Sequence, residues 1–523
     1  MKKETGKIPV IVGVTGHRDL REQDTADLKL AVQGELESLR TMYPHSDIVV
    51  MTSLAEGADQ LCAETAYEMG LDIITVLPMP ADEYAKDFEA ESLKKLNELI
   101  DCSSKVFIAP HKEPFEEGRD YLYRQAGIYI DGHCHILFAL WEGTQADSGG
   151  RGTGSIVETK LRNSASVNAG EQLRRADGAV VQIVTPRRNS GSVQKNAGEV
   201  IMHGDESTCR SILRDTDNYN KDCEKAADAC ASDDKLSAVY TASDRLSIIN
   251  DMKDRRVLIG LSACATVLTI AFLLYDEAEW HWMILLCGLM IISLFAINAL
   301  TRWTRFNERY VEYRILAESC RVQNYLRTAG ICREVTDIMP WNLQVTIPWV
   351  SKAVSAISAV EKAGEKKSIL DIWIAGQKDY HKKALKRTEL QLRRNDRMVT
   401  AALIITIATY IAALLFEIVC CGMISGTSMF APEINDAVRT GFKLCMGAFS
   451  AVTLFANNYY GRLALPNVID DHRKMVLLYE EAEREIAVKG EAEPLLLRIA
   501  EDELNENANW YAYQSKQDQS LGI

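Results

Sequence analysis

The chain has no CxxC pair, no GxxxxGK[ST] motif and no excess of basic residues. Its 13 cysteines are scattered and odd in number, which is typical of reduced thiols and not of a disulfide framework or a zinc site. The missing phosphate loop disfavours P-loop nucleotide hydrolysis. The net charge of −14 argues against a protein that coats nucleic acid, because contacts along a phosphate backbone need a cationic surface. We therefore expect no nucleic-acid partner and no metal.

Long uncharged apolar runs are concentrated after residue 256. They occupy residues 257–275, 283–301, 399–416 and 444–461. Each is 18 or 19 residues long, and a bilayer core about 30 Å thick needs roughly 20 residues at a rise of 1.5 Å each. The sequence therefore predicts four membrane spans in two hairpins. The fourth run is rich in Gly, Ser, Thr and Asn, so a buried core helix of a soluble protein is the alternative for it.

Basic residues are concentrated on one side of these runs, and the loop at 417–443 on the other side has only Arg439 and Lys443. Arg255 and Arg256 precede the first run and Arg302 and Arg305 follow the second, whereas the loop at 276–281 has no Lys or Arg. Because Lys and Arg are retained on the cytoplasmic side, we expect a multi-pass membrane protein with both termini in the cytoplasm. The polar stretch 1–7 predicts no signal peptide.

The order of polar and apolar stretches suggests six segments. They are an N-terminal domain at 1–200, a helical linker at 201–256, a first hairpin at 257–301, a cytoplasmic helical segment at 302–398, a second hairpin at 399–461, and cytoplasmic helices at 462–523. Both hairpins are followed by a charged helical exit, so a weak internal duplication is plausible. We expect an all-α membrane region that forms a homo-oligomer.

The N-terminal domain alternates β-branched runs with helical patterns. Strands are predicted at IPVIVGV, DIVVMTS, DIITVLP, KVFIAP, HILFALW and AVVQIVTP. This order is typical of a parallel sheet covered by helices on both faces, a Rossmann-like α/β fold. Three of the strands are followed by small or polar residues, and turns at the carboxyl ends of parallel strands bind ligands.

These turns and the helix before HILFALW supply the candidate ligand-binding residues. They are Thr15, Gly16, His17, Arg18, Ser53, Glu56, Gly57, Ala58, Asp59, Arg119, Arg124, Trp141, Gly150, Gly152, Thr153, Gly154 and Glu158. We expect backbone N–H groups of the first turn and Arg18 to face a phosphate or ribose. No residue is assigned as catalytic.

Most of these residues also have a structural interpretation. His17 is as well suited to fix its turn, and Glu56 and Asp59 to cap the next helix, as to touch a ligand. The arginines at 119 and 124 fit a solvated helix face. Trp141 could stack on a base or pack against the sheet, and the GRGTG stretch could be a surface loop.

On VGVTGHRDL, SLAEGADQLCAETA, LPMPADEYAKDF and ILFALWEG followed by GGRGTGSIVE, the chain resembles the SLOG superfamily. This Rossmann-like group includes the Lonely Guy cytokinin-activating enzymes, DNA-processing protein A and the ligand sensors of Thoeris defence. Lonely Guy enzymes carry PGGxGTxxE. Here Gly149, Gly150, Gly152 and Thr153 match, the proline is absent, and Glu158 lies two residues too late. The resemblance implies a nucleotide-binding site and puts the hydrolytic glutamate in doubt.

The helices around the spans resemble SLATT-type membrane effectors, which accompany SLOG genes in bacterial defence. Polar residues line one face of two spans, and they are Ser262, Thr266, Thr269, Lys443, Gly447, Ser450 and Asn457. Such a stripe could line a water-filled path or permit tight helix packing. Glu417 and Lys443 could pair near the outer ends or extend into the interface.

The combined resemblance implies a ligand-gated membrane effector of anti-phage type. A nucleotide-derived signal, such as an ADP-ribose derivative, would bind the N-terminal domain and trigger pore formation or membrane disruption. One alternative is a membrane-tethered nucleotide N-glycosidic hydrolase, with Glu158 and Arg124 as candidate acid/base and orienting groups. Another is a transporter or scaffold with a degenerate SLOG-like domain.

Overall fold

The computed structural model of the chain separates into two compact units. Unit 1 comprises Met1–Leu246, Glu312–Lys367 and Leu496–Asn509, and unit 2 comprises Ser247–Val311, Ser368–Leu495 and Trp510–Ile523. The structure describes residues 4–111, 118–143, 152–162, 178–188, 196–226, 232, 234–361, 367–421 and 428–517, without the side chains of 457, 458 and 462.

Unit 1 contains a seven-stranded sheet. The strands are β1 (Val10–Gly16), β2 (Ile48–Thr52), β3 (Asp72–Leu77), β4 (Lys105–Ile108), β5 (Ile136–Trp141), β6 (Ala179–Val184) and β7 (Val200–Gly204). Their order is β4-β3-β2-β1-β5-β6-β7. All neighbours are parallel except β6 and β7, which are antiparallel. The six predicted strands are confirmed, and β7 is an addition that the sequence did not predict.

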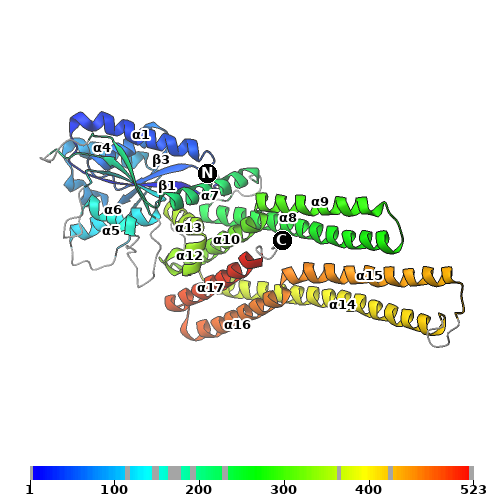
Figure 1. Cartoon of the computed structure of the whole chain (residues 1–523). Helices are drawn as coiled ribbons and strands as arrows, with labels where there is room; N and C mark the ends of the chain where they lie inside the picture. Colours follow the sequence, from blue (N-terminus) through cyan, green and yellow to red (C-terminus); the bar gives the residue numbers. More distant parts are fainter. Residues whose placement is uncertain are drawn as a thin grey trace. The chain divides into compact units, whose positions relative to one another are not determined.

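Helices cover both faces of this sheet. They are α1 (Thr25–Met42), α2 (Ala58–Glu68), α3 (Ala81–Tyr84), α4 (Ala90–Cys102), α5 (Arg119–His133) and α6 (Thr153–Arg162), with short 3-10 turns at Glu22–Asp24 and Ala85–Asp87. In Figure 1, α1 and α4 lie on one face of the sheet and α5 and α6 on the other. The inner strands β1, β2, β3, β5 and β6 are consequently buried on both sides, which is why their sequences are continuous runs of apolar, mostly β-branched residues, whereas the edge strands β4 and β7 are partly exposed.

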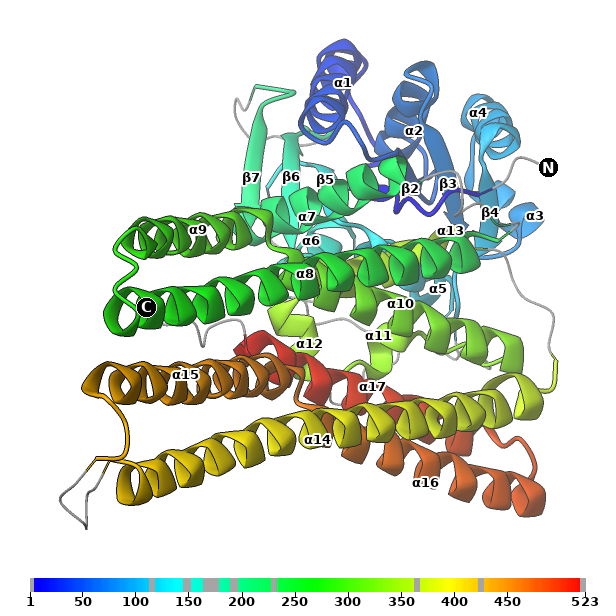
Figure 2. The ribbon, with the colours of Figure 1, turned by 90° about the vertical axis from the view of Figure 1, so that its right-hand side faces the viewer.

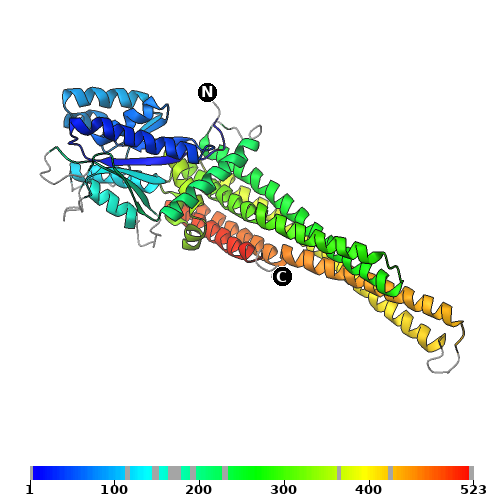
Figure 3. The same cartoon turned by 45° about the horizontal axis from the view of Figure 1, so that its top comes forward.

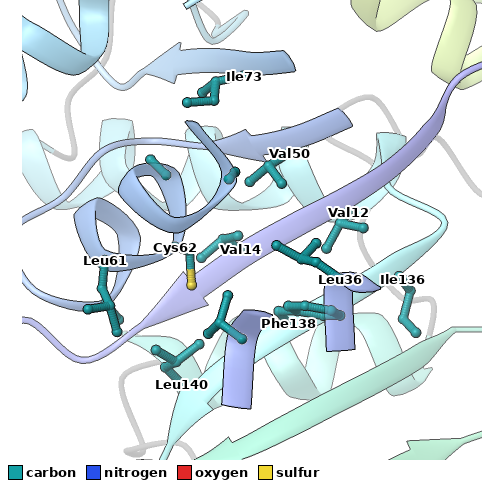
Figure 4. Close-up of a cluster of buried hydrophobic side chains, with 14 of the residues drawn as sticks. Val12, Val14, Leu36, Val50, Leu61, Cys62, Ile73, Ile136, Phe138 and Leu140 are labelled. Atoms are coloured by element: carbon teal, nitrogen blue, oxygen red, sulfur yellow. The ribbon is translucent and has the colours of Figure 1, made fainter. Parts of the chain in front are cut away.

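The main hydrophobic core lies between the sheet and the α1–α2–α4 layer. Side chains from β1, β2, β3 and β5 meet those of α1 and α2 there, and Figure 4 shows part of this cluster, including Val12, Val14, Phe138, Leu36 and Leu61. Phe138 and Val12 are at most 1% exposed. This packing holds the strands in register and so fixes the positions of the turns that follow them.

Unit 1 also contains helices from later in the chain. They are α7 (Glu206–Lys225), α10 (Phe306–Ala329), α11 (Val335–Ile338), α12 (Trp341–Thr346) and α13 (Pro348–Val360), with parts of α8 (Lys235–Glu277) and α17 (Glu493–Gln517). His133 Nε2 at the end of α5 lies 2.7 Å from Glu334 Oε1. Lys105 Nζ on β4 donates to the backbone oxygen of Ala359 at 2.7 Å. Residues far beyond 200 are therefore part of the sheet's own unit.

Unit 2 is helical. It contains most of α8, α9 (Met283–Thr304), a π-helical turn at Leu370–Ala375, α14 (Gly376–Val419), α15 (Pro432–Leu463) and α16 (Leu465–Lys489). The paired helices α8 with α9 and α14 with α15 form two antiparallel hairpins (Figure 3). Helix α14 packs along both α15 and α16, which Figure 2 shows in yellow and orange.

Three helical stretches are long and apolar enough to cross a membrane. They are Lys235–Glu277, Met283–Ala329 and Leu370–Val419, and they carry the first three predicted spans. Helix α15, which carries the fourth run, is not among them in the described part of the chain, so the fourth span stays a prediction. The structure supports a membrane protein with at least this set of apolar helices.

The charged residues at the hairpin tips pair differently from the expectation. Glu417 and Lys443 do not pair with each other. Arg439 donates to Glu417 at 2.7 Å, and Lys443 Nζ donates to Glu277 at 2.8 Å. Arg439 lies closer in sequence to the tip of the second hairpin than Lys443 does, so Arg439 is the residue that lies beside the end of α14. Lys443 faces α8 instead.

Candidate functional site

A cavity of about 750 Å³ lies at the carboxyl ends of the central strands of unit 1. Residues that follow β1, β2, β3 and β6 line it, together with one side of α5 and the start of α6. The strand order reverses between β1 and β5, because the chain first runs outward to β4 and then returns to the other side of β1. Ligands of open α/β sheets bind at such a switch point.

The cavity brings together many of the residues predicted from the sequence. Those that line it are Thr15, Gly16, His17, Arg18, Ser53, Asp59, Arg124, Gly152 and Thr153. The predicted residues Glu56, Gly57, Ala58, Arg119, Trp141, Gly154 and Glu158 are described but are not part of its lining. Gly150 lies outside the described residues.

Two glycines let the turns after β1 and β2 approach each other. A Cβ on Gly16 would lie 2.3 Å from the Cβ of Ala58, and a Cβ on Gly57 would lie 2.4 Å from the backbone oxygen of Arg18. Gly57 also has φ +85°, a conformation that strains other residues. The N–H of Ala58 donates to the backbone oxygen of His17 at 3.0 Å. Gly57 and Ala58 thus hold the two turns together behind the cavity wall.

His17 is buried in the cavity wall and faces two donors. Arg187 Nη2 lies 3.1 Å from His17 Nδ1, and the backbone N–H of Glu142 points at His17 Nε2 from 3.3 Å. Burial, and then the positive charge of Arg187, lower the pKa of His17 to about 4. A neutral imidazole has a single acceptor nitrogen, so it accepts from only one of these donors at a time.

Arg187 follows β6 and was not predicted as a site residue. Its Nε lies 3.9 Å from a carboxylate oxygen of Asp19 and 3.8 Å from one of Glu142, so Arg187 has two long ion pairs. The guanidinium has five N–H donors, and an anion in the cavity would compete for them with these two carboxylates and with His17. Arg187 is therefore placed to bind a phosphate or carboxylate.

Asp59 is a buried carboxyl group on the first turn of α2. Its Oδ2 accepts from the hydroxyl of Thr52 at 2.9 Å. Burial raises the pKa of Asp59 to about 6, although that hydrogen bond and the charge of Arg18 oppose the rise. The group can thus exchange a proton with a ligand near neutral pH.

Aromatic side chains form the wall next to Asp59. The guanidinium carbon of Arg18 lies 4.8 Å from the ring centre of Tyr123, and the rings of Tyr84 and Tyr123 are 5.9 Å apart. Tyr84 is fully buried, and its hydroxyl has no hydrogen-bond partner among the described residues. Tyr123 donates to Asp87, which fixes its ring. A planar ligand group could stack against this aromatic wall and form a hydrogen bond with the Tyr84 hydroxyl.

The start of α6 closes the cavity from the β5 side. Gly152 has φ +82°, and its backbone oxygen accepts from the N–H of Ser155 at 3.1 Å. Thr153 is the first residue of the helix, which runs to Arg162. The first N–H groups of a helix and its positive dipole end attract anions, so this end of the cavity also favours negative charge.

Three predicted residues have contacts outside the cavity. Arg119 donates to Asp87 at 2.7 Å, and the backbone oxygen of Trp141 accepts from Gln182 Nε2 at 3.1 Å. Glu158 lies in the second turn of α6, beyond the residues that line the cavity. Arg119 thus links α5 to the segment after β3, and the two alternatives for the Trp141 ring both stay predictions.

The sequence reasoning missed part of the lining. Tyr84 lies in LPMPADEYAKDF, Tyr121 and Tyr123 lie on the helix before HILFALW, and Arg187 directly follows AVVQIVTP. Each stands within a motif or after a strand that the sequence identified. A rule that every polar or aromatic residue directly after a predicted parallel strand is a candidate would have found Arg187.

In unit 2, the hydroxyls of the predicted polar stripe bond to their own helix. Thr266 Oγ1 donates to Ser262 O at 2.9 Å, and Thr269 Oγ1 donates to Ala265 O at 3.0 Å. A Cβ on Gly447 would lie 2.3 Å from Leu273, so α15 approaches α8 closely at that point. Ser450 is exposed, and the side chain of Asn457 lies outside the described residues.

The chain was compared with protein-family models and with curated proteins. No family model and no curated protein matches it. The arguments about its function therefore depend on the site itself.

Proposed function

We propose that the chain is a ligand-gated membrane effector whose unit 1 binds a nucleotide-derived signal, such as an ADP-ribose derivative. The resemblance to the SLOG superfamily and to SLATT-type effectors motivates the gating part of this proposal. The observation that carries the ligand part is the cavity of about 750 Å³ at the strand-order reversal. Its volume lies within the range of small-molecule and cofactor sites, about 300–1,000 Å³.

The chemistry of the lining supports a ligand with both phosphate and ring groups. Arg187 and the first turn of α6 supply positive potential at one side. The rings of Tyr84 and Tyr123 and the carboxyl group of Asp59 supply stacking and hydrogen bonding at another. A nucleotide combines an anionic part and a flat polar part in one molecule, and it matches both.

The proposed output is pore formation or membrane disruption by a homo-oligomer in the bacterial inner membrane, with both termini in the cytoplasm. The apolar helices of unit 2 support this placement. A single span would suffice for tethering, and the chain has several. For gating to occur, the ligand must bind the active arrangement more tightly than the resting one.

Ligand binding is tested by calorimetry on the full chain in detergent, with ADP-ribose and NAD as probes. Replacing Arg187 by alanine removes a charge-assisted contact and should weaken ADP-ribose binding by about 10- to 100-fold. Its neighbour Arg188 is the matched control, because its side chain is 64% exposed and outside the cavity lining. Equal affinities of both variants and the unmodified chain would refute the assignment of the anion site.

Gating is tested separately by dye release from liposomes that contain the full chain. ADP-ribose-dependent release that Arg18→Ala and Arg187→Ala abolish, and Arg188→Ala retains, is the expected result. Release that is independent of ligand in all variants would remove the gating claim while leaving the binding result intact.

The buried carboxyl group of Asp59 favours a second candidate, a membrane-tethered nucleotide N-glycosidic hydrolase. A carboxyl with a pKa of about 6 can donate a proton to a leaving base near neutral pH. Glu158 does not line the cavity, so Asp59 would take the role of the acid. Release of adenine from AMP by the full chain, lost in Asp59→Asn, would establish this function, because the leaving adenine must take up a proton. Binding without release would favour the sensor.

A further inference from the structure

Unit 2 has a cavity of its own, of about 390 Å³, at the junction between α15 and α16. Helix α15 ends at Leu463, and Ala464 adopts the left-handed conformation with φ +42° before α16 begins at Leu465. The facing wall is one side of α14, and it includes Asn395, Asp396 and Val399. The break between α15 and α16 thus opens a space against a continuous helix.

Asn395 is the unusual member of this lining. Its side chain is 2% exposed, and neither its amide nitrogen nor its amide oxygen has a hydrogen-bond partner in the described part of the chain. A buried amide that makes no hydrogen bond destabilises a protein, so such groups normally face water or a ligand. The amide borders a cavity, and a group bound there with both a donor and an acceptor would satisfy it.

The cavity lies at a defined depth along α14. Val399 begins the uncharged run 399–416, and Arg393, Arg394 and Arg397 precede it. In the membrane placement proposed above, this is the headgroup level of the cytoplasmic leaflet. The molecules present there at the highest concentration are phospholipids.

The polar groups around Asn395 select among headgroups. Asp396 supplies a negative charge, and the cavity includes Tyr460 and Gly461 in the last turn of α15, where helix carbonyl groups carry partial negative charge. The amide oxygen of Asn395 needs an N–H or O–H donor. A choline headgroup has no such donor, and a glycerol headgroup leaves the lipid with a net negative charge beside Asp396. A primary ammonium satisfies both requirements.

We propose that this cavity binds the headgroup of a phospholipid with a primary ammonium group, such as phosphatidylethanolamine. The ammonium donates to the amide oxygen of Asn395 and pairs with Asp396. The amide nitrogen of Asn395 donates to a phosphate oxygen of the same lipid. The inference rests on the proposed membrane placement of α14 and is independent of the ligand that unit 1 binds.

The test uses the full chain in nanodiscs made with phosphatidylethanolamine, phosphatidylcholine or phosphatidylglycerol, and it measures the thermal unfolding midpoint. A bound lipid stabilises the folded state, so the midpoint should be about 2 °C or more higher with phosphatidylethanolamine than with the other two lipids. Asn395→Leu should remove this difference without lowering the midpoint in phosphatidylcholine. Asp396→Asn should reduce the difference between phosphatidylethanolamine and phosphatidylglycerol.

Asp379→Asn is the matched control, because it makes the same change on an exposed face of α14 away from the cavity. It should retain the full lipid preference. Equal midpoints in all three lipids would overturn the proposal, as would an Asn395→Leu variant that is destabilised equally in each. A chain that stays soluble without detergent would refute the membrane placement and, with it, this site. A loss of ADP-ribose response would leave the lipid result unaffected.

Discussion

Polar side chains have opposite surroundings in the cavity of unit 1 and in the apolar helices of unit 2. In the cavity, the hydroxyl of Tyr84 has no partner among the described residues, and Arg187 competes with a backbone N–H for one imidazole. In the apolar helices, the hydroxyls of Thr266 and Thr269 donate to carbonyl groups one turn earlier in the same helix.

This difference separates polar groups with unused hydrogen-bonding capacity from polar groups whose capacity is already used. Hydrogen-bonding capacity left unused beside a cavity is available to a bound molecule, whereas a hydroxyl bonded to its own helix has little left to offer a passing ion. The polar stripe of the spans is thus better explained by close packing, which the approach of Gly447 to Leu273 supports. Four predictions test this contrast between the two units.

Gly57→Ala should have the largest effect. The new Cβ would overlap the backbone of Arg18, and φ +85° would strain the residue as well. Together these should lower the free energy of unfolding by about 4 kcal/mol, and ligand binding should be lost. Gly70→Ala is the control, because Gly70 has a similar φ of +71° but no atom within 4 Å of its Cβ. It should cost only about 1 kcal/mol. Equal costs would show that the turns are not in contact.

The second largest effect should be on the pH dependence of the free energy of unfolding. His17 is neutral when folded and its pKa is lowered to about 4, so its contribution is lost as the pH falls from 6.5 toward 4. Asp59 has a raised pKa of about 6, so the folded state gains stability as the pH falls over nearly the same range. Each contribution is about 3 kcal/mol, and they nearly cancel.

Single substitutions should expose these opposing contributions. Relative to the unmodified chain, Asp59→Asn should lose stability on acidification from pH 6.5, and His17→Gln should gain it, as measured by thermal unfolding in detergent at several pH values. Parallel pH curves for both variants and the unmodified chain would contradict the burial of these two groups.

Tyr84→Phe should have a smaller effect that appears only with ligand. The hydroxyl makes no hydrogen bond in the described structure, so the stability of the free chain should not fall. Affinity for ADP-ribose should drop about 5- to 10-fold if the ligand uses that hydroxyl. Tyr123→Phe is the comparison, because its hydroxyl already bonds to Asp87 and its loss should destabilise the free chain. Unchanged affinity of Tyr84→Phe would place the ligand elsewhere in the cavity.

Thr266→Val and Thr269→Val should have the smallest effect. Their hydroxyls are satisfied within the helix, so stability should change by no more than about 0.5 kcal/mol and ligand-dependent dye release should be retained. Gly447→Leu places a large side chain where α15 lies close to Leu273 of α8, so it should change the ligand-dependent dye release. Loss of release in the two threonine variants would restore the interpretation of the stripe as a water-filled path.

The sequence predicted the elements that depend on local pattern. Six strands follow from β-branched runs, and the turns after β1 and β2 follow from glycine and polar residues directly behind those runs. Strand β7 was not predicted, because it is short and alternates between half-buried and exposed residues at the sheet edge. Tyr84 and Arg187 were not predicted as site residues, because only the strand order brings the segments after β3 and β6 to the same cavity.

The segment boundaries show the same limit. Glu334 and Glu361 lie in what the sequence suggested was a cytoplasmic segment between hairpins, yet within unit 1 Glu334 bonds to His133, and Glu361 accepts from the backbone N–H of Leu236. Contacts between residues so far apart in the sequence cannot be predicted from the local pattern of polar and apolar residues. Pairing of long-range charges could have been inferred only from the fold.

The composition of unit 1 has a consequence for how the protein is made. Arg321 of α10 lies 3.7 Å from Glu503 of α17, and both belong to unit 1 together with the sheet. A ribosome produces the sheet first and α17 only after every apolar helix has emerged. Unit 1 therefore reaches its full set of contacts last, and a nascent chain that stalls before α17 carries an incomplete unit 1.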